Sequence, residues 1–156
     1  MKIKLLSPNA KMPTKGSTLS AGYDLYVAND TIVKPGRNLV PLDFAIELLP
    51  GWEGHIRPRS GFSAKGFEGH KIIDNGYDTT PSRYDADVLQ GTIDADYTGN
   101  VCVIVKSYEN APFMVMKGTR IAQLVIETHY SGSLVQVTEL SETERGEGGF
   151  GSTGTH

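Results

Sequence analysis

The stretch Thr98-Gly-Asn-Val-Cys-Val-Ile-Val-Lys106 joins a turn signal to five consecutive apolar residues, and it decides the fold class. Glycine and asparagine favour a tight reversal of the chain, and a short run rich in valine and isoleucine is typical of a buried strand. The sequence predicts many such short strands. The other candidates are Lys2 to Leu6, Tyr23 to Val27, Phe44 to Leu48, Glu53 to Arg57, Ile121 to Glu127 and Leu134 to Val137.

Turn signals separate these runs, as expected for strands that reverse direction repeatedly. They include Pro35-Gly36, Pro50-Gly51, Asn75-Gly76 and Lys117-Gly118. No window has the periodicity of a long amphipathic helix. We therefore expect an all-β protein, a distorted jelly-roll sandwich or barrel.

The segment from Gly66 to Val88 breaks this rhythm, because it exceeds the usual connection of about 4–6 residues. Lys71-Ile-Ile73 could form one strand of a surface hairpin, with Asn75-Gly76 as its turn. A solvated loop is the alternative. We interpret residues 66–88 as an insertion-like excursion within a single domain that spans residues 1–144.

The composition excludes several classes of protein. The chain has 15 basic and 18 acidic residues and so no bias toward a polyanion, and we expect no nucleic-acid partner. Its single cysteine, Cys102, excludes a disulfide or a cysteine metal site within one chain. No apolar stretch reaches membrane-spanning length, and the N-terminus lacks the features of a signal peptide. We expect no membrane partner and a cytoplasmic location, in the host cytoplasm if the source is a virus.

The last twelve residues, Arg145-Gly-Glu-Gly-Gly-Phe-Gly-Ser-Thr-Gly-Thr-His156, are rich in glycine and carry one arginine, one aromatic ring and adjacent hydroxyls. Ordering ten such residues costs on the order of 10 kcal/mol, which burial of Phe150 alone cannot offset. A phosphorylated ligand with several charge-assisted hydrogen bonds could offset it. We expect residues 145–156 to form a flexible lid, with a functionless terminus as the alternative.

Four upstream segments carry polar residues that strand packing does not require. Asp24 lies within an otherwise alternating strand, where it either faces solvent or has a buried partner. The segment from Pro58 to Lys65 supplies cations, hydroxyls and a glycine, as a phosphate-binding turn does, although a basic surface turn fits equally. Asp94 and Asp96 share one face of a strand and could hold and deprotonate a water, or could belong to an acidic hairpin. Gln123 is the polar exception in its strand and could serve a ligand or lie on an edge.

Taken in order, the segments AGYDLYV, PRSGFSAKG, GTIDADYTG, KGTRIAQL and RGEGGFGSTG resemble the five motifs of the trimeric dUTP diphosphatase (dUTPase) family. The resemblance spans Ala21 to Gly154. It implies a jelly-roll homotrimer with active sites shared between subunits. The implied reaction is hydrolysis of dUTP to dUMP and pyrophosphate, which limits uracil incorporation into DNA and supplies dUMP for thymidylate synthesis. The implied cofactor is Mg²⁺, held by the triphosphate and waters with no direct protein ligand.

The resemblance also implies roles for individual residues. Asp94 would activate the water that attacks the α-phosphorus, and Tyr97 would lie against the deoxyribose. The main chain around Leu89 and Gly91 would read the uracil edge, and Asp24 would lie near the metal's waters. The remaining implied substrate contacts are Arg59, which braces the site, Ser60, Gly61, Ile93, Gln123, Arg145, Phe150, which would stack on uracil, Gly151, Ser152 and Thr153.

Three features depart from the family pattern. Val88 stands where the family usually has asparagine, and Thr119 stands where it usually has an acidic residue. The excursion at 66–88 is longer than usual and could offer a surface to a protein partner. A dCTP deaminase relative is the alternative enzyme, and a regulatory protein switched by the nucleotide is the alternative of a different class.

Overall fold

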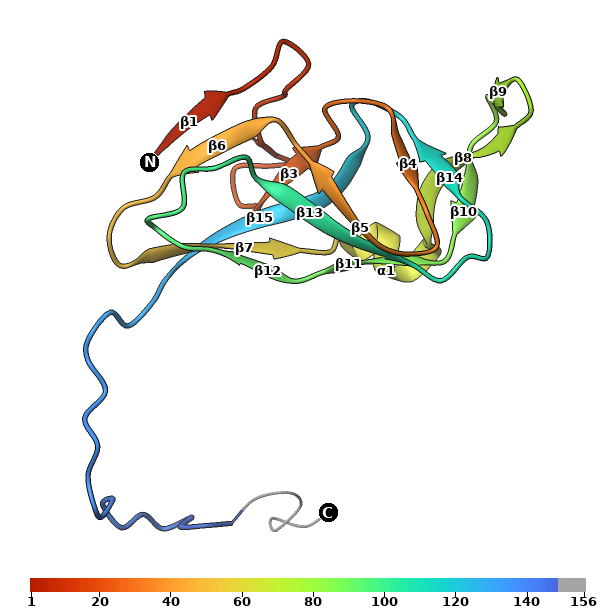
Figure 1. The fold of residues 1–156 in the computed structure, drawn as a ribbon. Helices are drawn as coiled ribbons and strands as arrows, with labels where there is room; N and C mark the ends of the chain where they lie inside the picture. Colours follow the sequence, from red (N-terminus) through yellow and green to blue (C-terminus); the bar gives the residue numbers. More distant parts are fainter. Residues whose placement is uncertain (149–156) are drawn as a thin grey trace.

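The computed structural model describes residues 1–148 as a β-protein with a long extended segment at its C-terminal end (Figure 1). Within this range the one helix, α1 (Ser60–Lys65), has six residues, and no helix is long and apolar enough to cross a membrane. The strands are β1 (Lys2–Leu5), β2 (Thr14–Lys15), β3 (Gly22–Tyr26), β4 (Thr31–Val33), β5 (Gly36–Pro41), β6 (Phe44–Glu47), β7 (Trp52–Arg57), β8 (Phe67–Ile73), β9 (Gly76–Tyr77), β10 (Ser82–Tyr84), β11 (Ala86–Leu89), β12 (Gly91–Ile93), β13 (Cys102–Ser107), β14 (Phe113–Val115) and β15 (Arg120–Thr128).

These strands form four antiparallel sheets. The strand orders are β12-β7-β15-β3-β2, β11-β13-β5, β10-β8-β14-β4 with β9 beside β8, and the ribbon β1-β6. The sheets curl around one shared core (Figure 1). The expectation of an all-β jelly-roll-type fold is therefore confirmed.

The core is filled by alternate residues of strands whose other face is open. Val103 and Val105 of β13 are buried, whereas Ile104 between them is 36% exposed. We expected this run to be a buried strand, but antiparallel sheets commonly pack only one face. The largest fully buried side chains are Phe44, Phe67, Phe113, Leu25, Leu42, Ile121 and Leu124.

Six of the seven predicted strands match observed strands to within one residue at each end, but the predicted strand from Leu134 to Val137 is wrong. That segment has no regular structure, and Leu134 is 94% exposed. Apolar, β-favouring residues form a stable strand only when a neighbour accepts their backbone hydrogen bonds. After β15 the chain leaves the body instead, so none of the described strands lies beside this segment (Figure 1).

The segment from Gly66 to Val88 is more integrated than an excursion. The single strand expected at Lys71-Ile-Ile73 extends back to Phe67, and β8 pairs with β10, β14 and β9. Phe67 is fully buried, and its ring centroid lies 4.5 Å from that of Phe62. The Tyr84 ring stacks on the Phe113 ring with 4.2 Å between their centroids. The small β8–β9 turn around Gly76 is the part of this segment that projects (Figure 1).

Candidate active site

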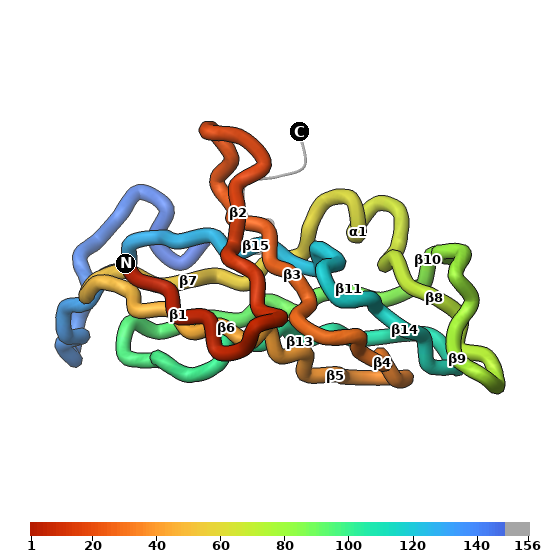
Figure 2. The backbone as a smooth tube through the Cα atoms, turned by 90° about the horizontal axis from the view of Figure 1, so that it is seen from above, coloured from red at the N-terminus to blue at the C-terminus, as the bar shows by residue number. Residues whose placement is uncertain are grey.

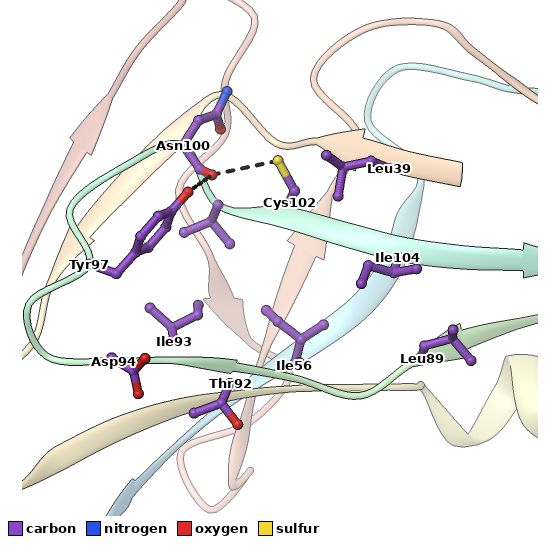
Figure 3. A pocket seen from close by; sticks show the side chains of 12 residues that line it. Leu39, Ile56, Leu89, Thr92, Ile93, Asp94, Tyr97, Asn100, Cys102 and Ile104 are labelled. Carbon is purple, nitrogen blue, oxygen red and sulfur yellow. Dashed lines mark hydrogen bonds between the residues drawn. The ribbon is translucent and has the colours of Figure 1, made fainter. Parts of the chain in front are cut away.

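One cavity, which we call the Asp94 cavity, lies between β12 and β13 and has a volume of about 310 Å³. Figure 3 shows Asp94 and Tyr97 on one side of it, and apolar side chains of β5, β11 and β13 on the other. Its lining residues are Leu39, Ile56, Leu89, Gly91, Thr92, Ile93, Asp94, Tyr97, Asn100, Val101, Cys102 and Ile104.

Asp94 follows β12 directly and opens a tight turn, in which the Tyr97 amide donates to the Asp94 carbonyl oxygen at 3.1 Å. The residue is exposed, and no hydrogen bond between the described residues uses its carboxylate. A carboxylate in this position is free to accept hydrogen bonds from water or from a ligand hydroxyl.

The Tyr97 ring is fixed across the same turn. Its hydroxyl donates to the Asn100 carbonyl oxygen at 2.9 Å, and the Cys102 thiol donates to the same oxygen at 3.5 Å (Figure 3). A Cβ on Gly99 would lie 2.7 Å from the Tyr97 hydroxyl, so glycine is needed there for the ring to lie flat over the turn. The Asn100 amide in turn donates to Asp43 at 3.2 Å.

The backbone of β11 and β12 forms another wall of the Asp94 cavity. Gly91 pairs with Ile56 of β7, and an added Cβ on Gly91 would meet nothing closer than 3.9 Å. Leu89 lines the cavity, whereas Val88 points into the core and is 5% exposed, because successive residues of a strand face opposite sides. The departure from the family pattern at Val88 is therefore a core residue in this chain.

A second cavity, the Asp24 cavity, has a volume of about 400 Å³ and a largely polar lining. It lies beside the β2–β3 hairpin, which projects from the body in Figure 2. Its lining residues are Gly16, Ser20, Ala21, Gly22, Asp24, Arg59, Ser60, Gly61, Arg120 and Gln123.

Two arginines hold the Asp24 carboxylate. The Arg59 Nε donates to Asp24 Oδ1 at 2.9 Å, and Arg120 Nη1 donates to Oδ2 at 3.1 Å. Arg59 Nη1 also donates to the Arg120 carbonyl oxygen at 3.2 Å, so Arg59 braces the cavity wall. The Asp24 side chain is 15% exposed, and one carboxylate faces two guanidinium groups. The excess positive charge suits an anionic ligand.

Gln123 and α1 complete this cavity. The Gln123 amide donates from Nε2 to the Pro58 carbonyl oxygen at 2.9 Å. Ser60 and Gly61 begin α1, so the predicted glycine turn is one short helix, anchored by Phe62 on Phe67 and ended at Gly66 with φ of 81°. Ser60 and Gly61 are exposed toward the cavity.

The predicted site residues thus fall into two groups that share no cavity. Ile93, which precedes Asp94, pairs with Gly54 of β7, whereas Gln123 of β15 pairs with Arg57. The two positions are about 9–10 Å apart across the sheet, two strand spacings, and about 10 Å apart along β7. Asp94 and Gln123 of one chain therefore do not meet at one reacting atom.

Arg145, the one predicted C-terminal contact among the described residues, lines neither cavity. Arg145 is exposed on the extended segment, and its Nε donates to the Gly148 carbonyl oxygen at 2.7 Å. Phe150, Gly151, Ser152 and Thr153 lie outside the described residues. Among residues 1–148, no three histidine, cysteine, aspartate or glutamate side chains cluster as metal ligands would.

The comparisons with known proteins agree with this geometry. The dUTPase family model matches residues 8–80 and 82–154. The chain belongs to the dUTPase family. It is 46% identical over 154 residues to the deoxyuridine 5'-triphosphate nucleotidohydrolase of Arabidopsis thaliana, a match that covers 98% of this chain and 82% of the relative.

Two solved phage structures resemble this dUTPase-family fold. A mutant of the dUTPase of Staphylococcus bacteriophage 80alpha, solved with dUpNHpp, aligns with a TM-score of 0.81 and 29% identity over 98% of this chain and 97% of that one. A variant dUTPase from phage phi11 of S. aureus, described with a structural Mg(II) ion, aligns with a TM-score of 0.72 and 25% identity over 88% and 96% of the two chains.

Sequence reasoning missed several residues of the two dUTPase cavities. Leu39 and Ile104 are exposed apolar residues that face each other in register across β5 and β13, and only this pairing brings them to the Asp94 cavity. Arg120 lies in the fourth motif, and its position at the start of β15 could have signalled a partner for Asp24. Gly22 was also missed, because only the structure shows that the Gln123 side chain occupies the space where a Cβ on Gly22 would lie.

Proposed function

We propose that this chain hydrolyses dUTP to dUMP and pyrophosphate, with Asp94 as the catalytic base. Membership of the dUTPase family supports this reaction, as do relatives named for it. The observation that carries the proposal is an exposed carboxylate, Asp94, beside a fixed aromatic ring and an open strand backbone in one cavity.

In this mechanism Asp94 accepts a proton from a bound water. The water oxygen attacks the α-phosphorus in line, and the bond to the oxygen that bridges to the β-phosphate breaks, so that pyrophosphate leaves. The exposed Asp94 carboxylate suits this role because no hydrogen bond from the described residues competes for its lone pairs.

The Asp94 cavity would hold the nucleoside. The Tyr97 ring, whose hydroxyl donates to the Asn100 carbonyl oxygen, would lie against the deoxyribose, leave no room for a 2′-hydroxyl and so select deoxyribose by shape. The main chain at Leu89, Gly91 and Ile93 would pair with the uracil edge as a neighbouring strand does.

The Asp24 cavity would hold the phosphates. Ser60, Gly61 and the Gln123 amide would donate hydrogen bonds near the scissile bond, and Arg59 would stay paired with Asp24. Arg145, Gly151, Ser152 and Thr153 would close over the terminal phosphates, and Phe150 would stack on uracil, a contact that contributes about 1–3 kcal/mol in other base-binding proteins.

Because the two cavities lie apart in one chain, we propose a homotrimer in which the Asp94 cavity of one subunit meets the Asp24 cavity of another. The C-terminal segment, which leaves its own body, would reach a neighbouring site. Light scattering should give three times the 16.9 kDa of one chain. An active monomer would contradict shared sites.

Mg²⁺ would bind the triphosphate and waters, and when bound it neutralises charge on the phosphates. The residues present fit this arrangement, because the Asp24 carboxylate keeps free lone pairs beyond its two arginine contacts and faces a polar cavity. The related phi11 structure described with Mg(II) adds support.

The decisive experiment is pyrophosphate release measured side by side with dUTP, dCTP, dTTP and UTP. We expect clear preference for dUTP. Pyrophosphate release mainly from dCTP would contradict the proposed specificity for uracil. A cytoplasmic location and a protein partner for residues 66–88 stay predictions.

A further inference from the structure

A third cavity, the Arg83 cavity, adjoins the Asp24 cavity and has a volume of about 410 Å³. Its lining includes four cationic side chains and one acidic side chain. The residues are Arg59, Gly61, Phe62, Lys65, Glu68, Arg83, Gly118, Thr119 and Arg120.

The two cavities share a wall. Arg59, Gly61 and Arg120 line both of them, so the guanidinium groups that hold Asp24 on one side also border the Arg83 cavity on the other. Cationic side chains therefore continue from the lining of one cavity to the lining of the other.

The segment from Gly66 to Val88 brings Arg83 to this place. Strand β10 pairs with β8 so that Arg83 lies opposite Glu68, and Arg83 Nη2 lies 3.1 Å from Glu68 Oε2. Arg83 Nη1 also donates to the carbonyl oxygen of Gly66, the residue that ends α1, at 3.3 Å. Figure 2 shows α1, β8 and β10 on the same side of the molecule.

Positive charge exceeds negative charge around the Asp24 and Arg83 cavities. The linings of the two cavities together hold four cationic side chains, Arg59, Lys65, Arg83 and Arg120, and two acidic ones, Asp24 and Glu68. The whole chain, by contrast, carries a net charge of −3. The side chains of Arg83 and Arg120 are 47% and 52% exposed, so solvent ions reach them. A local positive field in a net acidic chain attracts and concentrates small anions.

We propose that the Arg83 cavity binds inorganic pyrophosphate, the leaving group of the proposed reaction, and that Arg83 determines its affinity. The inference rests on the proposed function for the identity of the anion. Arginine suits this ligand because its planar donor fork matches phosphate oxygens. Glu68 competes with the anion for the same guanidinium group.

Because Glu68 competes with the anion, removing its charge should change pyrophosphate affinity in the opposite direction to removing the charge of Arg83. An ion pair with a purely structural role would not give opposite changes. Pyrophosphate is titrated calorimetrically into the full chain without nucleotide, and binding is compared among wild type, Arg83→Gln, Glu68→Gln and a matched control, Arg37→Gln. Arg37 is an exposed arginine on β5, away from this cavity. Thermal melting of each variant checks that it is folded.

We expect Arg83→Gln to weaken pyrophosphate binding by about three- to tenfold, Glu68→Gln to strengthen it, and Arg37→Gln to leave it unchanged. No binding to wild type, or equal binding by folded Arg83→Gln, would overturn the proposal. The readout needs no turnover. A chain that binds pyrophosphate in this pattern but does not hydrolyse dUTP would refute the proposed function alone, whereas an active enzyme without the pattern would refute the cavity alone.

Discussion

Gly22 of β3 lies diagonally across from Gln123 of β15, so closely that a Cβ on Gly22 would lie 2.3 Å from Gln123 Oε1. Real Cβ atoms essentially never approach a neighbour within 3.0 Å. Gln123 is held there by its hydrogen bond to the Pro58 carbonyl oxygen, next to Asp24 in register. Gly22 therefore leaves the space in which the Gln123 amide lies at the Asp24 cavity, and the hydrogen bond to Pro58 holds the amide there.

Gly22→Ala should displace the Gln123 side chain and break its hydrogen bond to Pro58. The loss of one such bond costs about 1 kcal/mol, which lowers the melting temperature by about 2–4 °C in a chain of this size. The KM for dUTP should also rise, because the displaced Gln123 amide would no longer point at the phosphates. Gly16→Ala also adds a methyl group to the lining of the Asp24 cavity, but its Cβ would meet Ser20 Oγ at an ordinary 3.6 Å, so it separates the effect of the close approach from that of the added methyl group. Equal effects of the two substitutions would show that the close approach does not position Gln123.

Asp94→Asn should lower kcat by about 10²–10⁴ while dUTP still binds, because the amide cannot take the proton from water. Pyrophosphate release measures turnover, and calorimetry with a non-hydrolysable dUTP analogue measures binding. Asp96→Asn serves as the control, since this exposed neighbour does not line the Asp94 cavity. Retention of most turnover by the Asp94 variant would remove Asp94 from the mechanism.

Removal of residues 145–156 should nearly abolish turnover and leave the melting temperature unchanged. The body ends its regular structure at Thr128, and the described part of the removed segment packs against none of the strands. Pyrophosphate release, thermal melting and light scattering are measured on the same preparation. A fully active truncated chain would contradict a closing C-terminal segment.

Cys102 should react slowly with iodoacetamide at pH 8. Burial raises the pKa of the Cys102 thiol, and nearby Asp43 raises it further, so the nucleophilic thiolate is depleted. Because the folded state favours the neutral thiol, this group's contribution to stability is present below the unfolded pKa and is lost as the pH rises through the folded pKa. Alkylation should accelerate on unfolding in urea. Equal rates in the folded and unfolded chains would contradict the raised pKa.

The order of strands and turns was predictable because each signal is local. The runs at Phe44 and Ile121 became β6 and β15, since side-chain alternation is a property of a few neighbouring residues. The turn expected at Asn75-Gly76 lies one residue earlier, at Asp74-Asn75, and Gly76 begins β9. The strand predicted at Leu134 does not form, because no neighbouring strand pairs with it among the described residues. A strand needs a partner, and local pattern does not supply one.

The sequence by itself determined the fold class and the family, and motifs such as GTIDADYTG and PRSGFSAKG supplied the candidate residues for the chemistry. Only the tertiary structure decided where those residues lie. It placed Asp94 after β12 and Gln123 on β15, on opposite sides of β7, and it turned Val88 into the core. It also brought Arg83 to the cavity that adjoins the Asp24 cavity. These outcomes depend on strand register and sheet order, which are set by contacts between residues far apart in the chain.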